Sequence, residues 1–208
     1  MRHRYLGYLA IGAAAMLPLA GCGGGAAETE TEVAGKQGAL LTNLQERCGQ
    51  AIRGKMVSGE NEELADRELV LAIAPCEPGS DVTMALHANV GPLQVSRDQE
   101  IWDRSRSMTL SQNGDALTVT LGDYAQDGTA GPMQGLQATG SGAQTDTSQT
   151  FTISGAEQPA EQPLVIGADG QVISLQIPAS KAAKGFTAEF NASDRVAMPP
   201  SAWGPAGS

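Results

Sequence analysis

The sequence is poor in the residues from which many catalytic and nucleic-acid-binding sites are built. Only 4% of its 208 residues are aromatic, it has two histidines, and 23 acidic residues outnumber 13 lysines and arginines. The resulting net charge of −10 argues against a nucleic acid partner, because such binding depends on neutralising phosphates with Lys and Arg. The same charge argues against docking of the protein surface onto anionic lipid headgroups.

Recognisable catalytic motifs are absent as well. The chain has no Gly-x-Ser-x-Gly, Ser-x-x-Lys, His-Glu-x-x-His or P-loop pattern. A nucleophile activated by histidine would have to rely on His87, whereas a carboxylate-pair hydrolase would leave no trace in residue spacing. We therefore expect no cofactor and no enzymatic activity, and an enzyme is the least favoured of three function classes.

The N-terminus has the pattern of an export signal. Arg2 and Arg4 are followed by a mainly apolar stretch over residues 5–17 and then by Leu19-Ala20-Gly21-Cys22. A charged start, a short apolar core and small residues before a cleavage point are typical of a secretory signal peptide. The apolar stretch is shorter than the roughly 20 residues that a membrane-spanning helix needs. The pattern predicts a signal peptide over residues 1–21.

Leu-Ala-Gly-Cys resembles the lipobox of bacterial lipoproteins. The resemblance implies acyl chains such as palmitate on Cys22 and a lipid-anchored protein of the cell envelope. Gly23 stands where an aspartate would retain a lipoprotein at the inner membrane, so an outer membrane address is expected in a two-membrane cell. The outer face of the plasma membrane is expected otherwise. The alternative is an ordinary secretory signal that happens to contain a cysteine.

Two further cysteines, Cys48 and Cys76, are expected to form a structural disulfide bond, because an even pair in an exported domain is most simply a bridge. A redox pair would normally show Cys-x-x-Cys, and a structural metal site would need four ligands.

Residues 22–38 are rich in Gly, Glu and Thr and predict a flexible tether. A single domain is expected over residues 39–198, followed by a Pro/Gly-rich tail over residues 199–208.

The hydrophobic pattern predicts a mainly β domain with one helix. Apolar residues recur every four positions in residues 39–53, which indicates an amphipathic helix. Residues 69–74 are continuously apolar, as in a strand covered on both faces, and residues 135–149 are typical of a Gly-rich loop. Short alternating runs and two Asx-Gly turns predict strands and hairpins over the residues that follow: 82–90, 108–111, 117–121, 151–153, 164–166, 172–177 and 186–190. We expect an antiparallel β-sandwich or open barrel with one N-terminal α-helix packed on it.

One stretch suggests a surface for contact with another molecule. Arg97, Arg104 and Arg106 surround Trp102 in an otherwise acidic chain, and Trp and Arg are favoured at binding hot spots. The alternative is that Trp102 covers one end of the core while neighbouring acids pair locally with the arginines. We expect the alternative more than the contact patch.

Two weaker candidates are a metal site and a calcium site. His87 lies on the polar phase of its expected strand, which favours a solvated or hydrogen-bonded surface role over a metal site with Met84. The acidic residues near the start of the domain lack the loop pattern of a calcium site, so a solvated charged face is expected. These residues are Glu60, Glu62, Glu63 and Asp66.

The favoured function is a non-catalytic envelope lipoprotein whose domain binds another protein or supports an assembly. The alternative is a lipoprotein that binds a small ligand such as a lipid, a glycan or a metal. That alternative predicts an apolar cavity, or a groove lined by Trp102, Tyr124 or Trp203.

Overall fold

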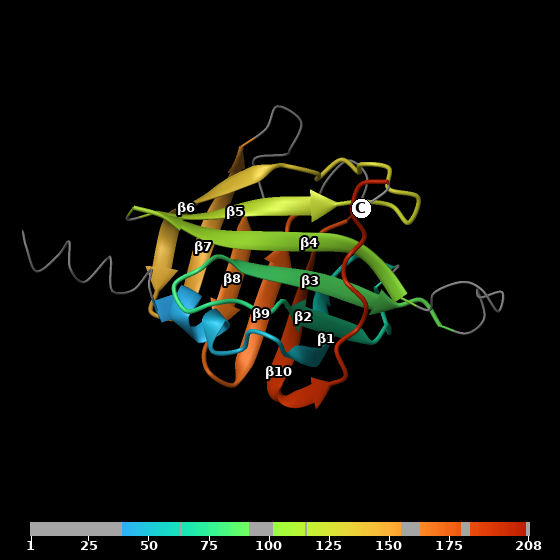
Figure 1. Ribbon diagram of the computed structural model, residues 1–208, viewed down its shortest axis with the longest axis horizontal. Coiled ribbons are helices and arrows are strands. Elements are labelled where there is room, and N and C mark those ends of the chain that lie inside the picture. The colour runs from blue at the N-terminus through green and yellow to red at the C-terminus, as the bar shows by residue number, and fades with distance from the viewer. Residues whose placement is uncertain are drawn as a thin grey trace, which may run out of the picture.

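The computed structural model describes residues 39–62, 64–91, 102–114, 116–154, 163–179 and 184–206, without the side chains of residues 142–144. Ten antiparallel strands follow one another around a closed barrel, and the last strand pairs with the first (Figure 1). The strands are β1 (Ala51–Gly59), β2 (Leu69–Ile73), β3 (Val82–Asn89), β4 (Trp102–Asn113), β5 (Ala116–Asp123), β6 (Gln137–Thr145), β7 (Ser148–Ser154), β8 (Leu164–Ala168), β9 (Val172–Ile177) and β10 (Phe186–Val196).

Alternation along the strands builds the interior of the barrel. On β5, for example, Leu117, Val119 and Leu121 are buried, while the residues between them are partly or fully exposed. Inward side chains from all ten strands meet in one apolar core. Phe151 and Phe190 are the largest of its fully buried members.

The expectation of a sandwich or an open barrel was wrong. Mainly β structure was predicted correctly, but two strands were missed, and both are needed for closure. Residues 51–53, which the sequence pattern places at the end of the helix, begin β1, which pairs with β10. The Gly-rich segment 135–149, which its composition predicts to be a loop, mostly forms β6, which joins β5 to β7.

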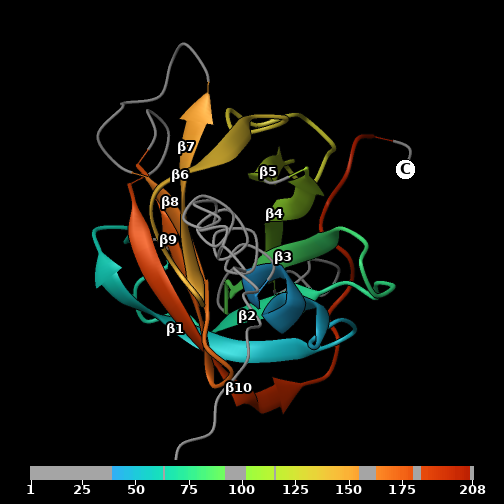
Figure 2. The same cartoon turned by 90° about the vertical axis from the view of Figure 1, so that its left-hand side faces the viewer.

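The helix is shorter than predicted and closes one end of the barrel. It spans residues 39–45, and a series of turns follows. Leu40, Leu41 and Leu44 are buried in the barrel core, so the helix acts as a plug at this end (Figure 2). Asn43 donates a hydrogen bond of 2.9 Å to the carbonyl of Ala168 in β8 and so fastens the plug to the barrel wall.

The disulfide between Cys48 and Cys76 is present. Its Cα atoms lie 5.5 Å apart, and its residues are 28 positions apart in the sequence. The bridge joins the turns after the helix to the connection between β2 and β3. It therefore holds the plugged end of the barrel together.

The C-terminal segment, residues 197–206, lies on the outside of the barrel rather than projecting from it (Figure 1). The backbone N–H of Trp203 donates to the carbonyl of Arg104 in β4 at 3.0 Å. Ala202 and Trp102 pack over a small apolar cluster on the outer face, which contains Val70 and Ala72. This cover explains why β2 is buried on both of its faces, as its continuous apolar sequence predicted.

Both predicted Asx-Gly hairpins are confirmed. Gly114 and Gly170 adopt left-handed backbone conformations, with φ of 61° and 95°, at the β4–β5 and β8–β9 turns. Asp169 accepts hydrogen bonds from the backbone N–H groups of Gln171 and Val172, and these bonds hold the pKa of its carboxyl below the usual value.

Candidate functional site at the open end of the barrel

The end of the barrel opposite the helix contains an apolar pocket of about 220 Å³. Its wall is formed by residues of β3, β4, β5, β9 and β10 that lie toward this end of the barrel. The loop between β5 and β6 closes part of its mouth. The apolar lining consists of Leu86, Met108, Leu121, Pro132, Met133, Ile177, Pro178 and Phe186. The polar lining includes Asn61, Arg106, Asp123 and Lys184.

A bulge in β4 decides which polar side chains face this pocket. Leu86 pairs with Arg106, but Ala88 pairs with Asp103, so β4 carries one residue more than β3 over this stretch. Arg106 lies in phase with the inward Met108, and the bulge places Asp103 opposite an inward residue of β3 as well. Arg104, between them, faces the outside.

Arg106 and Asp103 form an ion pair beside the pocket. The distance from Nη1 of Arg106 to Oδ2 of Asp103 is 2.8 Å, and about a quarter of each side chain is exposed. The other oxygen of Asp103 accepts the backbone N–H of Ser105 at 2.9 Å, within the bulge itself. The carboxylate thus orients the guanidinium and stabilises the bulge at the same time.

Asp123 holds the loop over the pocket. Its carboxylate accepts the backbone N–H of Met133 at 3.1 Å, and its own N–H donates to the side chain of Gln134 at 2.8 Å. Gly131 lies directly against the same carboxylate, where a Cβ atom would find no room. These contacts place Met133 in the pocket lining.

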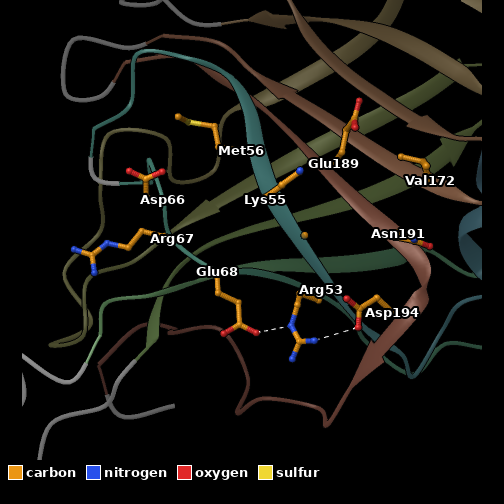
Figure 3. Close-up of a pocket in the computed structure, with 11 residues that line it drawn as sticks. Arg53, Lys55, Met56, Asp66, Arg67, Glu68, Val172, Glu189, Asn191 and Asp194 are labelled. Atoms are coloured by element: carbon orange, nitrogen blue, oxygen red, sulfur yellow. Dashed lines mark hydrogen bonds and ion pairs between the residues drawn. The ribbon is translucent and has the colours of Figure 1, made fainter.

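A second and larger hollow, of about 610 Å³, lies on the outer face of β1 and β10 (Figure 3). Its charges largely neutralise one another. Arg53 forms ion pairs of 2.6 Å with Glu68 and 3.2 Å with Asp194, and between a third and a half of each side chain is exposed. The hollow is shallow and its lining contains no aromatic side chain. The mouth pocket, although smaller, is the better enclosed and the more apolar, and it is the stronger candidate site.

His87 is not on the surface, contrary to expectation. It lies on the outer face of β3, as its phase predicted, but its side chain is completely buried. Neither ring nitrogen has a hydrogen-bond partner among the described residues. Burial lowers the pKa of His87 to about 4; the positive charge of Arg104 acts in the same direction and Asp103 opposes it. Met84 points into the core, so the two residues do not share a site.

The predicted contact patch is divided by the barrel wall. Trp102 packs on the outer apolar cluster and not over an end of the core, and Arg104 lies over the ring of Trp203, 5.7 Å from its centre. Arg106 faces the pocket, paired with Asp103. Arg97 falls outside the described residues, as does Cys22.

The pocket residues other than Arg106 were not identified from the sequence. Met133, Ile177 and Phe186 look like ordinary core residues there, because only the closed barrel brings them to one mouth. The aromatic residues expected to line a site, Trp102, Tyr124 and Trp203, do not line this pocket. Of the expected acidic cluster, Glu60 lies 3.5 Å from Lys184, and Glu63 is outside the described residues.

Two features are absent from the described part of the chain. None of its helices is long and apolar enough to cross a membrane. No group of three or more His, Cys, Asp or Glu side chains in those residues is arranged to hold a metal ion. In comparison with known proteins, no family model, curated protein or solved structure matches this chain.

Proposed function

We propose that this protein is an envelope lipoprotein whose barrel binds a small apolar ligand in the mouth pocket. The observation that supports this most is the asymmetry of the two barrel ends. One end is filled by the leucines of the helix, whereas the other retains a hollow of about 220 Å³ with a mainly apolar lining. Barrel mouths are among the places where small-molecule sites commonly occur.

The size of the pocket limits the ligand. A drug-sized ligand typically occupies about 300–1,000 Å³, so this pocket suits something smaller. If each heavy atom takes roughly the 30 Å³ of a water molecule in the liquid, about seven heavy atoms fit inside. A short alkyl chain or a single small ring system is therefore the class of ligand that we propose.

The location proposed from the N-terminus is compatible with this function. A lipid on Cys22 would hold the barrel near a membrane, where apolar small molecules are concentrated. The disulfide between Cys48 and Cys76 supports an extracytoplasmic compartment, because such bridges persist in oxidising environments. The anchor itself remains a proposal from the lipobox resemblance.

The protein-binding function favoured from the sequence stays a prediction. Within the described residues, the exposed large hydrophobic side chains are Val57 on β1 and Met198 in the C-terminal segment. Contiguous exposed apolar patches mark many interaction sites, and single residues do not. The geometry therefore gives more support to the small-ligand alternative.

The proposal can be tested with 1-octanol, a neutral probe with a short apolar chain. Calorimetric titration of the purified full chain at pH 7.5 should show saturable binding. Ile177→Trp places a large ring in the pocket and should abolish it. Val57→Trp adds the same ring to the exposed outer face and should leave binding unchanged. Absence of saturable binding to the unaltered chain, or equal binding by Ile177→Trp, would contradict the proposal.

A further inference from the structure

The charged groups around the mouth pocket are not equally available to a ligand. Arg106 and Lys184 supply two positive charges to the lining, and Asp123 supplies one negative charge. Asp103 and Glu60 pair with the two cations. What each group already binds decides which kind of polar head the pocket could accept.

The carboxylate of Asp123 is already engaged in contacts within the protein. Its carboxylate accepts the N–H of Met133 and lies against Gly131, so it forms part of the loop closure. It is also the cross-strand partner of Arg106 in the β4–β5 register. A cationic ligand head approaching Asp123 would therefore meet the positive charge of Arg106 next to it.

Arg106 keeps donors to spare. A guanidinium has five N–H groups, and the ion pair with Asp103 is made through Nη1. The remaining donors belong to a rigid, planar fork that suits a carboxylate. Because Arg106 is three-quarters buried and is held in place from one side, it can bind an anion with little loss of side-chain freedom.

Lys184 adds a second positive charge at the rim, on a more exposed side chain. Its Nζ lies 3.5 Å from Glu60, but both side chains are well exposed, so this pair is worth little. The ammonium can therefore turn toward a ligand head at low cost. Arg106 and Lys184 are thus the cations at the rim, and the three carboxylates beside them, those of Asp103, Asp123 and Glu60, are each already engaged by groups of the protein.

Resting on the proposed function, we infer that the ligand is a short-chain amphiphile with a carboxylate head. The chain fills the apolar pocket and the head binds Arg106 at the rim. About seven carbon atoms fit within the pocket volume, so a chain of about eight carbons places its carboxylate at the level of Arg106. The inference concerns the charge of the head, which the apolar lining alone does not determine.

Three probes with the same chain length are octanoate, 1-octanol and octylammonium. They separate the claim that the pocket binds an apolar chain from the claim that the ligand head is a carboxylate. At pH 7.5 the full chain should bind octanoate about tenfold more tightly than 1-octanol, as expected for a charge-assisted hydrogen bond. Octylammonium should bind more weakly than 1-octanol. Arg106→Gln should remove this preference, so that octanoate binds no more tightly than 1-octanol. Arg53→Gln, which removes an ion-paired arginine from the outer hollow, is the matched control and should change neither affinity.

A second variant is expected to increase octanoate affinity, an effect that loss of folding cannot produce. Asp103→Asn removes the competing charge but can still accept the N–H of Ser105, and it should raise octanoate affinity severalfold. If 1-octanol binds but octanoate binds no better, or octylammonium binds best, the inferred head is wrong and the pocket proposal stands. If none of the three probes binds, the proposed function itself fails.

Discussion

Arg104 and Trp203 connect the barrel to the C-terminal segment through three contacts. The guanidinium lies 5.7 Å from the centre of the indole ring, its Nη1 donates to the carbonyl of Ser201 at 2.6 Å, and the Arg104 carbonyl accepts the N–H of Trp203. The segment continues to Ala206, which lies against Gly128 in the loop between β5 and β6. A segment that looks like a loose tail in the sequence thus covers the outer face from β10 to the open end.

Replacing Trp203 should loosen this segment. We expect Trp203→Ala to destabilise the protein by about 1–2 kcal/mol, because it removes a cation–π contact and part of the cover over the outer face. Amide hydrogen exchange should accelerate in residues 198–206 while β5 and β9 stay protected. Trp203→Phe keeps an aromatic ring over Arg104 and should lose less. Unchanged exchange in Trp203→Ala would show that the segment is held by other contacts.

His87 should make stability depend on pH. Its pKa is about 4 in the folded state and about 6.5 when unfolded, so the unfolded chain binds more protons between these values. Stability should therefore be unaffected by His87 above pH 6.5 and should fall as the pH drops toward 4, by about 3 kcal/mol in total.

Denaturant unfolding of the full chain and of His87→Phe at pH 7.5 and 4.5 measures this effect. The variant replaces a buried imidazole without a described partner by an apolar ring, and it should lose less stability on acidification than the unaltered chain. Equal losses in both proteins would assign the acid sensitivity to carboxylates instead.

The disulfide should stabilise the plugged end of the barrel. Closing a loop of this length contributes roughly 3–4 kcal/mol in the chain-entropy model. Cys48→Ser with Cys76→Ser should lower the free energy of unfolding by about that amount, and reduction of the unaltered chain should do the same. A melting temperature insensitive to reductant would contradict the structural role of the bridge.

Gly131 should control the pocket through the loop. A side chain at this position would collide with the carboxylate of Asp123, so Gly131→Ala should displace the loop and Met133 with it. We expect 1-octanol affinity to fall about tenfold while global stability changes by no more than about 1 kcal/mol, because most loop residues are outside the core. Gln126→Ala, at an exposed position of the same loop outside the pocket lining, is the control and should bind normally.

The strands that could be predicted from the sequence are those with a strong hydrophobic signal. Val119 and its neighbours alternate clearly, and the turns at Gly114 and Gly170 have the residues that a tight hairpin requires. In contrast, β1 contains Arg53, Gly54 and Lys55, and its buried Ile52 fits the period of the preceding helix as well as that of a strand. The choice is decided by pairing with β2 and β10, which are distant in sequence.

Gly54 shows why composition was misleading. Glycine usually weakens a strand, but here the ring of Phe190 lies over its Cα and occupies the space that a side chain would need. The same ambiguity affected β6, whose many small residues resemble a linker. The mouth pocket could not be foreseen for a related reason: its lining comes from five strands and a loop, and the bulge that brings Asp103 to the same side as Arg106 leaves no signal in the sequence.

The most direct test of the ligand-binding claim is NMR of methionine methyl groups during titration with 1-octanol. Met108 and Met133 line the mouth pocket, Met56 lines the outer hollow, and Met198 is exposed on the C-terminal segment. We predict saturable shifts at Met108 and Met133, with Met56 and Met198 unchanged. Shifts at Met56 with none at Met108 and Met133 would show that the outer hollow, and not the barrel mouth, binds the probe.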